Sequence, residues 1–396
     1  MDAYVQEGRA TAGSRGLAGV NPYELPAMVN AHSHAFQRDL RGAAERPAPE
    51  AHAADDFWSW REAMFAQASR HDPRSMRDVA GRVFAEMAAA GYGAVGEFHY
   101  VHHRPDGTPY EDPNAMAIAV AEAARAAGLR IVLLPAAYTR AGWNGADLPP
   151  SAGQRRFCDP SVDAFLARVD GLRDWADTRD GVRVGVAAHS VRAVPASWLE
   201  AIAAYSERHG LVRHVHAHEQ PRELEECRAE HGLSPVELLD RCGFLGSRTS
   251  LIHGIHVEAG DVRLIAASDT IVVSCPTTEG SLGDGYFPAL TYRDAGVRIA
   301  IGTDSQVRVD PFEEARELET LARRERRTRH ALLAGYGDLW GELARNGRAS
   351  LGLEDAGTIA VDRDHPDLRG IADEDVALAV ATCASAAVVC RAAGPG

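Results

Sequence analysis

The chain has 396 residues, an apolar share of 45% and a formal net charge of −14. This acidic balance argues against nucleic acid and anionic membranes as partners, but it allows an anionic small molecule that meets local cations. All 42 basic residues are arginines, which excludes a Walker A lysine, a Schiff-base lysine and a carbamylated bridging lysine.

Eight short apolar segments alternate with helical patterns along most of the chain. Most are rich in Val, Ile and Ala on both faces, as buried parallel strands are. The predicted strands are 28–31, 93–98, 130–135, 182–188, 211–217, 249–254, 270–275 and 297–302. Helical patterns, often closed by glycine, lie at 74–90, 113–127, 161–176, 197–209, 235–242 and 259–267. Eight such repeats predict an α/β fold of the (β/α)8 TIM-barrel type.

An open, doubly wound sheet is the alternative fold, but no dinucleotide-binding glycine pattern supports it. Residues 37–60 and 136–158 are predicted to be long loops, and the second is a candidate lid. Within the C-terminal segment, Thr358–Val361 is a candidate extra strand. We expect two domains. Residues 28–349 form the barrel, and residues 1–27 together with 350–396 form a small β appendage, which is an incomplete sandwich.

The cysteines and the N-terminal sequence predict the compartment. Six cysteines are scattered without a C-x-x-C pattern, which is typical of reduced thiols. The N-terminal residues show no basic-then-apolar signal pattern, and no apolar run is long enough to span a bilayer. We therefore expect a cytoplasmic protein.

Polar residues follow several of the predicted strands. His32 and His34 end the first strand, and side chains two residues apart on a strand point the same way. The other strand ends are Glu97–Tyr100, His189–Arg192, His214–Glu219, His253–His256 and Gly302–Ser305. Because the catalytic groups of this fold come from the C-terminal ends of strands, these residues predict one site.

The residue types indicate a metal-dependent hydrolase. His32, His34, one histidine of the fifth strand and Asp304 form a three-His, one-Asp set that suits zinc. Fe²⁺ is an alternative on ligand type. A metal lowers the pKa of its water towards ~7, and Asp304, His253 and Glu219 are expected to handle the protons of the reaction.

The fifth strand offers three histidines for the metal. His214, His216 and His218 share one face if the strand stays regular. We favour His216 because Glu219 follows three residues later, a spacing that brings a ligand and an acid/base to one substrate. His214 and His218 are expected to support the site or to pack.

Longer motifs resemble a known family. The histidines of strands one, five and six and the aspartate of strand eight are similar to those of the amidohydrolase superfamily. Within it, the chain resembles the formimidoylglutamate deiminases (N-formimino-L-glutamate iminohydrolases) of histidine degradation. The motifs that carry this resemblance are Asn30–Arg38, Phe57–Glu62, Glu97–His103, Gly153–Phe157, His189–Ala193 and Leu282–Pro288.

The resemblance implies zinc-dependent hydrolytic deimination of N-formimidoyl-L-glutamate to N-formyl-L-glutamate and ammonia. The implied ligands of a single Zn²⁺ are His32, His34, His216 and Asp304. Glu219 resembles the acid/base at the imine, and His253 resembles the residue that helps Asp304 to activate water. The implied substrate-binding residues are Gln37, Arg61, Tyr100, His189 and Arg192. Arginines suit a dicarboxylate because a guanidinium can bind a carboxylate in a bidentate way.

The chain departs from the family pattern at two positions. His218 stands where the family has a small residue, and Gln306 stands where it has a histidine. Both are expected close to the metal, where they would affect the choice of substrate. The terminal segments are shorter than in the family, so we expect an incomplete sandwich and altered contacts in a homodimer.

Two other functions stay open. The chain could act on another formimidoyl, guanidino or aminopurine-type substrate as a related amidohydrolase. It could also be a degenerate barrel kept as a binding or scaffold protein, whose mark would be the loss of a ligand or of the acid/base. Neither loss is found in the sequence.

Overall fold

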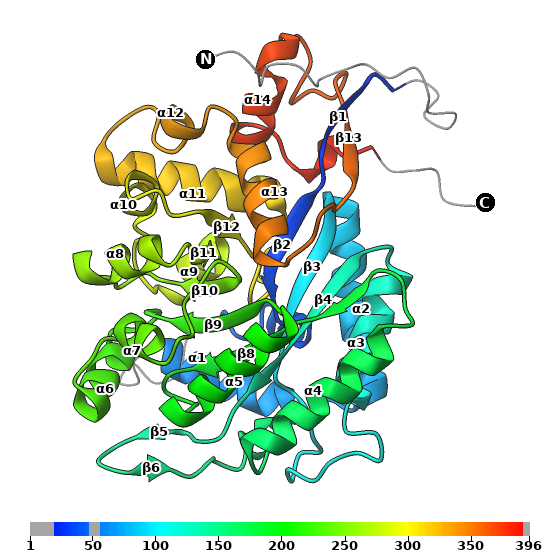
Figure 1. The fold of residues 1–396 in the computed structure, drawn as a ribbon. Helices are drawn as coiled ribbons and strands as arrows, with labels where there is room; N and C mark the ends of the chain where they lie inside the picture. Colours follow the sequence, from blue (N-terminus) through cyan, green and yellow to red (C-terminus); the bar gives the residue numbers. More distant parts are fainter. Residues whose placement is uncertain (1–19, 47–55, 391–396) are drawn as a thin grey trace.

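The computed structural model describes residues 20–46 and 56–390. In this part of the chain, eight parallel strands alternate with helices and form a nearly closed barrel (Figure 1). The barrel strands are β2 (Met28–Ser33), β3 (Tyr92–His99), β4 (Arg130–Ala137), β8 (Val186–Ser190), β9 (Arg213–Ala217), β10 (Thr249–His253), β11 (Ile271–Ser274) and β12 (Ile299–Ile301). The short β7 (Val182–Val184) also pairs with β4. The predicted (β/α)8 fold is therefore confirmed, and the alternative of an open, doubly wound sheet is excluded.

The barrel closes between its first and last strands. The backbone N–H groups of Thr303 and Asp304 donate to the carbonyl of His32, and the N–H of His34 donates to the carbonyl of Asp304. Gly302 permits this approach, because a Cβ placed there would lie 2.7 Å from the carbonyl oxygen of His32. The closure of the barrel therefore brings two histidines of β2 and Asp304 together.

Six helices fall where the sequence predicts them. They are α2 (Pro73–Ala90), α3 (Ala115–Ala126), α4 (Val162–Ala176), α5 (Ala196–His209), α7 (Pro235–Arg241) and α8 (Ala259–Ala267). Local chemistry sets their ends: the Asp72 side chain caps α2, and Gly91 ends it with a left-handed φ of 101°. The α-helices of the described residues that the sequence did not predict are α1 (Phe57–Ala68), α6 (Pro221–His231), α9 (Pro276–Leu282), α10 (Ala289–Asp294), α11 (Pro311–Arg326), α12 (Leu333–Tyr336), α13 (Leu339–Ser350) and α14 (Val376–Thr382).

Both predicted long loops contain regular structure. In the first, the 3-10 helix η1 (Ala35–Leu40) follows β2, and α1 begins at Phe57 because Asp56 caps it in a capping box with Ser59. Residues 47–55 lie outside the described part. In the second, the described elements are the hairpin of β5 (Gly142–Trp143) with β6 (Asp147–Leu148) and the 3-10 helix η2 (Arg155–Phe157). The predicted loops therefore contain short regular elements, and the first one extends into the start of α1.

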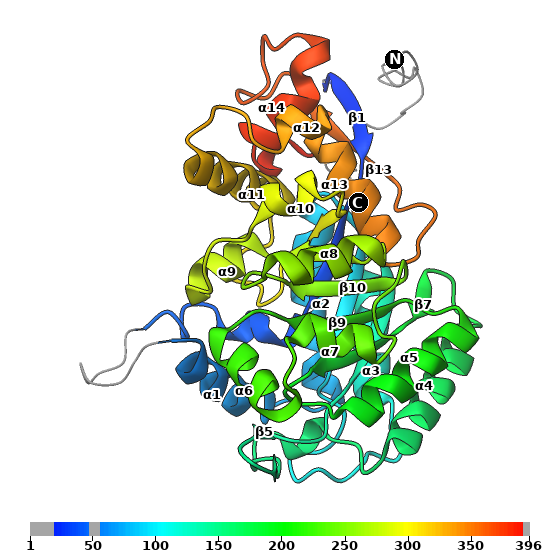
Figure 2. The same cartoon turned by 60° about the vertical axis from the view of Figure 1, so that its left-hand side comes forward.

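The terminal segments form a small sheet beside the barrel. β1 (Pro22–Pro26) pairs antiparallel with β13 (Thr358–Asp362), which confirms the extra strand. The elements after β13 are η3 (Asp373–Asp375), α14 (Val376–Thr382) and η4 (Ala386–Val388). Figures 1 and 2 place this sheet at the end of the molecule opposite the β5–β6 hairpin. The domain boundaries stay a prediction, and residues 1–19 and 391–396 lie outside the described part.

Helix α13 and the turn after it fill the barrel at the N-terminal ends of its strands. Ser350 Oγ lies 2.7 Å from Ser250 Oγ, and Leu351 is buried where a side chain at Gly96 would collide with it. Because these contacts fill the N-terminal end, the polar residues that follow the strands lie at the open, C-terminal end of the barrel. All six cysteines are free thiols, as predicted. Among the described residues, no helix has both the length and the apolar content needed to cross a membrane.

Candidate active site

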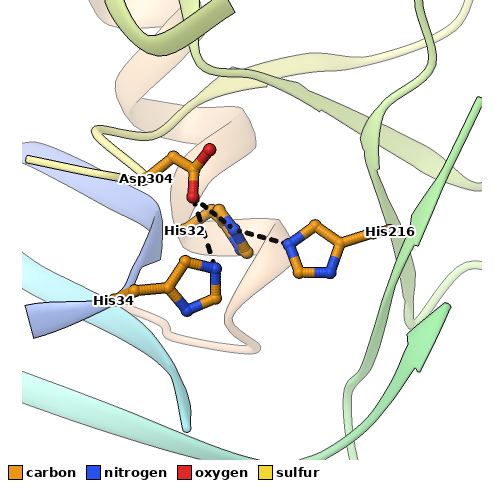
Figure 3. Close-up of side chains that lie close together, drawn as sticks. All are labelled: His32, His34, His216 and Asp304. Atoms are coloured by element: carbon orange, nitrogen blue, oxygen red, sulfur yellow. Dashed lines mark hydrogen bonds and ion pairs between the residues drawn. The ribbon is translucent and has the colours of Figure 1, made fainter. Parts of the chain in front are cut away.

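The four predicted metal ligands lie together at the C-terminal end of the barrel strands (Figure 3). His32 Nε2 lies 3.1 Å from His216 Nε2 and 3.4 Å from Asp304 Oδ1. His34 Nε2 lies 3.3 Å from the same Oδ1. All four side chains are buried. In a tetrahedral zinc site, bonds of about 2.0–2.1 Å put neighbouring donor atoms about 3.3–3.4 Å apart, so this spacing fits zinc.

Hydrogen bonds outside the cluster orient two of the imidazoles. His34 Nδ1 lies 2.7 Å from the carbonyl of Phe98, and His216 Nδ1 lies 2.8 Å from the carbonyl of His189. Because a carbonyl only accepts, we assign the hydrogen of each ring to Nδ1. Each Nε2 then presents its lone pair towards the point that the four donor atoms surround, which is the arrangement that ligates a cation.

The protonation of the three histidines also suits a metal. Burial lowers the pKa of His32 and His216 well below the usual value, and it lowers that of His34. Neighbouring imidazoles lower the pKa of His32 and His216 further. Neutral imidazole is the form that binds metal ions, and three nitrogens with one carboxylate oxygen form a zinc-type donor set.

A buried network lies behind the ligands. Glu97 accepts hydrogen bonds from Ser33 Oγ at 2.6 Å and from the Ala35 N–H at 2.7 Å. Gln306 Nε2 donates to Ser33 Oγ and to the carbonyl of Asp304, both at 2.9 Å. Gln306 thus ties the turn after β12 to β2. Its side chain supports the ligands from behind and is absent from the pocket lining. The effect of Gln306 on substrate choice stays a prediction.

His218 points away from the metal ligands. The expected common face of the three strand-five histidines ends at Ala217, where β9 stops, and His218 has a φ of 58°. Its Nδ1 lies 2.8 Å from the carbonyl of His256, and its Nε2 accepts from the Val236 N–H at 3.2 Å. His214 bonds a backbone carbonyl of α13 at the other end of the barrel. The expectation that His218 affects substrate choice is therefore not supported by its position.

His253 lies among three carboxylates. Its Nε2 is 3.5 Å from Glu219 Oε1 and 3.9 Å from Asp304 Oδ2, and its Nδ1 is 3.3 Å from Glu279 Oε1. Burial opposes protonation, but the three carboxylates outweigh it and raise the pKa of His253 to about 10. Burial also raises the pKa of Glu219 above its usual value. A carboxyl group tuned upwards in this way is suited to proton exchange near neutral pH.

The five predicted substrate-binding residues line one pocket with Glu219 and His253. They are Gln37, Arg61, Tyr100, His189 and Arg192. Gln37 Nε2 donates to the hydroxyl of Tyr100 at 2.8 Å, and the Tyr100 ring lies 5.0 Å from that of His34. This pair is therefore next to the metal ligands.

Sequence reasoning missed part of the pocket wall. The missed lining residues are Phe57, Trp60, Met64, Phe65, Tyr138 and Leu282. Four of them belong to α1, whose first turn, residues 57–60, was predicted to be loop. The spacing of Phe57, Trp60 and Met64 is helical and could have revealed this helix.

Three guanidinium groups surround Trp58 at the pocket. The Cζ atoms of Arg61, Arg192 and Arg222 lie 4.6, 5.2 and 4.6 Å from the centre of its ring. Burial, and next the charge of Arg192, lower the pKa of Arg61. Arg222 also pairs with Glu226 at 2.7 Å and was not predicted. The positive charges of Arg61 and Arg192, which both line the pocket, favour an anionic ligand there.

Comparisons with known proteins agree with this geometry. Residues 23–364 match the profile of the amidohydrolase family. A formimidoylglutamate deiminase from Pseudomonas aeruginosa is 38% identical over 331 residues, which are 84% of this chain and 71% of that protein. A 5-methylthioadenosine/S-adenosylhomocysteine deaminase from Halobacterium salinarum is 28% identical over 323 residues, which are 80% of this chain and 66% of that protein.

Solved structures share the fold. An amidohydrolase from Brucella melitensis superposes with a TM-score of 0.84 at 33% identity, over 92% of this chain and 84% of that one. A zinc-bound adenosine deaminase from Xanthomonas campestris has a TM-score of 0.75 at 22% identity, over 93% of this chain and 78% of that one. The family match spans all eight barrel strands and all four clustered ligands. The chain belongs to the amidohydrolase family.

Proposed function

We propose that this hydrolase deiminates N-formimidoyl-L-glutamate to N-formyl-L-glutamate and ammonia. The observation that carries the proposal is that Arg61 and Arg192 line the same pocket as Glu219 and the metal-ligand cluster. Two cations match the two carboxylates of the glutamate, and the acid/base serves the amidine. The identity to the deiminase from Pseudomonas aeruginosa supports this assignment.

One zinc ion would be held by the cluster of three histidines and one aspartate, with Fe²⁺ as the alternative on ligand type. The ligands would be His32, His34, His216 and Asp304. When bound, such a metal lowers the pKa of a water molecule towards about 7 and so supplies the attacking nucleophile at neutral pH. A homodimer and a cytoplasmic location stay predictions.

The pocket residues suggest the orientation of the substrate. Gln37 and Tyr100 lie beside His34, so they would hold the amidine end. Arg61 and Arg192 lie farther along the pocket, against Trp58, and would bind the carboxylates in a bidentate way. His189 packs on the rings of Tyr100 and Tyr138 and would close the wall between the two ends.

Glu219 would move the protons of the reaction. A carbon–oxygen bond forms as water adds to the amidine carbon, and Glu219 accepts the proton that the water loses. Glu219 gives this proton to the imine nitrogen, which becomes an amino group. It then moves the remaining hydroxyl proton to that amino group, so that the C=O bond of the formyl group forms, the carbon–nitrogen bond breaks and ammonia leaves. His253, protonated between Glu219 and Asp304, would keep both carboxylates turned towards the reacting atoms.

The names of more distant relatives favour a second candidate function. They include the Halobacterium salinarum deaminase and an isoxanthopterin deaminase that is 30% identical over 284 residues. The second candidate is therefore aminohydrolysis of an aminopurine or pterin ring. A neutral ring, however, would leave the guanidinium groups of Arg61 and Arg192 in the pocket without a carboxylate to bind.

An ammonia-release panel tests the choice. Zinc-loaded protein is assayed with N-formimidoyl-L-glutamate, with a formimidoyl compound lacking the side-chain carboxylate, with a guanidino acid, and with S-adenosylhomocysteine. We expect the highest kcat/KM with N-formimidoyl-L-glutamate. A higher kcat/KM with any of the other three compounds rejects the proposal. If no compound releases ammonia and the protein binds no metal, a binding protein is favoured instead.

A further inference from the structure

A second group of donor atoms lies beside the first one. His253 ends β10, Cys275 follows β11, and Asp304 follows β12, so three neighbouring strands supply the group. One nitrogen, one sulfur and one oxygen atom from these residues lie within 4.8 Å of one another. The three side chains are buried, and the proposed reaction gives Cys275 no role.

The carboxylate of Asp304 serves both groups with different oxygens. Its Oδ1 faces His32 and His34 at 3.4 and 3.3 Å, whereas its Oδ2 lies 3.9 Å from His253 Nε2. A carboxylate placed in this way can bridge two cations. The second position therefore adds to the first site without taking away any of its ligands.

The imidazole of His253 has the orientation of a metal ligand. Its Nδ1 donates to Glu279 Oε1 at 3.3 Å, and its buried Nε2 makes no hydrogen bond. In metal sites, the ligating histidine commonly donates its other N–H to a carboxylate, which fixes the ring. Glu279 is held in turn by Ser274 Oγ and by the Cys275 N–H, both at 2.8 Å.

We propose that His253 Nε2, Cys275 Sγ and Asp304 Oδ2 form a second cation site for a borderline or soft divalent ion such as Zn²⁺, Co²⁺ or Cd²⁺. A thiolate selects such ions over Mg²⁺ and Ca²⁺. Glu219 Oε1, 3.5 Å from His253 Nε2, is close enough to add a fourth donor. As the ion enters, His253 and the Cys275 thiol each release one proton to solvent, so the buried charge does not change.

Occupation of this site is inhibitory. The ion displaces the proton of His253 and binds the carboxylates of Asp304 and Glu219. The proposed reaction uses all three of these groups. The site would thus reduce activity when zinc is in excess. This inhibition rests on the proposed function, but the binding of the ion does not.

Cobalt titration of metal-free protein tests the binding. Co²⁺ bound to a thiolate gives a charge-transfer absorption that nitrogen and oxygen ligands do not give. We expect the wild type to bind two Co²⁺ per chain and to show this absorption with the weaker one. Cys275→Ser is expected to bind one Co²⁺ without the absorption, whereas Cys383→Ser, which alters an exposed cysteine far from the site, is expected to behave as the wild type.

Binding of only one Co²⁺ by the wild type, or an unchanged absorption in Cys275→Ser, would overturn the proposal. Circular dichroism shows whether Cys275→Ser is folded, and Cys275→Ala provides a second variant without a thiol. In the activity assay, inhibition of Cys275→Ser should need about tenfold more zinc than the wild type. If the protein binds a second Co²⁺ with thiolate absorption but is inactive on N-formimidoyl-L-glutamate, the proposed function is rejected and the second cation site is still supported.

Discussion

The Nε2 atoms of His32 and His216 lie 3.1 Å apart, although 184 residues separate these histidines in the chain. His32 ends the first barrel strand, and His216 lies on the fifth barrel strand across the interior. Together with His34 and Asp304 they surround one point at the end of the barrel. We therefore expect the metal, and not only the fold, to depend on each of these residues.

Replacement of a ligand should remove the metal. His216→Ala deletes one of four donors, so bound zinc should be lost and ammonia release should fall to background. Elemental analysis after dialysis measures this loss. His218→Ala is the matched control, because His218 contacts Val236 and His256 instead of the ligands, and this variant should keep its zinc. A full complement of zinc in His216→Ala would refute the ligand assignment.

Arg192 should matter mainly for substrate binding. Arg192→Ala removes a charge-assisted hydrogen bond to a carboxylate, so KM should rise about 10- to 100-fold with a smaller change in kcat. Steady-state kinetics with N-formimidoyl-L-glutamate measures both constants. Arg248→Ala, which breaks only a surface pair with Glu207, should leave both unchanged. An unaltered KM in Arg192→Ala would show that its carboxylate role is wrong.

Glu219 should control the chemical step. Glu219→Gln keeps the shape of the side chain but cannot accept the proton, so kcat should fall about 10²- to 10⁴-fold while zinc content is retained. Parallel kinetic and metal measurements separate these two effects. If kcat stayed within a factor of about two, Glu219 would not be the acid/base.

Gln306 should stabilise both the fold and the metal site. Gln306→Ala leaves the buried hydroxyl of Ser33 without its donor, which costs about 1–3 kcal/mol of unfolding free energy. The loss of support behind Asp304 should also weaken metal binding about 10- to 100-fold. Urea denaturation and metal competition measure the two effects. Gln67→Ala in α1 should change neither, and equal behaviour of the two variants would contradict the account.

Acid should destabilise the protein through His99. Burial, with Arg168 and Arg156 nearby, lowers the pKa of His99 to about 3, against about 6.5 in an unfolded chain. Between these values only the unfolded chain binds the proton, so stability falls as the pH falls through this window. His99→Gln should reduce the slope of unfolding free energy against pH by about 1.4 kcal/mol per pH unit at pH 4–6. Equal slopes in both proteins would reject this prediction.

The barrel could be predicted because its strands are buried on both faces. Continuous runs such as Arg130–Ala137 are easily recognised as strands, and the barrel places their C-terminal ends together. The four clustered ligands followed from residue type and strand position. Helix α1 was harder to recognise, because some of its apolar side chains pack on the barrel while others, such as Trp58, meet the pocket arginines.

Other features depend on contacts that a sequence does not state. The left-handed backbone of His218 turns its side chain away from the ligands, and a regular strand pattern predicts the opposite. The position of Arg222 against Trp58 depends on how α6 packs near α1. The shared use of Asp304 by two donor groups is likewise visible only in three dimensions.

Identification of both products shows whether the enzyme cleaves the terminal carbon–nitrogen bond of the amidine. Zinc-loaded protein is mixed with N-formimidoyl-L-glutamate, and the products are followed by proton NMR together with an ammonia assay. We predict one N-formyl-L-glutamate and one ammonia for each substrate consumed, because Glu219 protonates the terminal nitrogen. Formamide and L-glutamate as products, or an intact substrate under conditions in which S-adenosylhomocysteine is deaminated, would contradict this prediction.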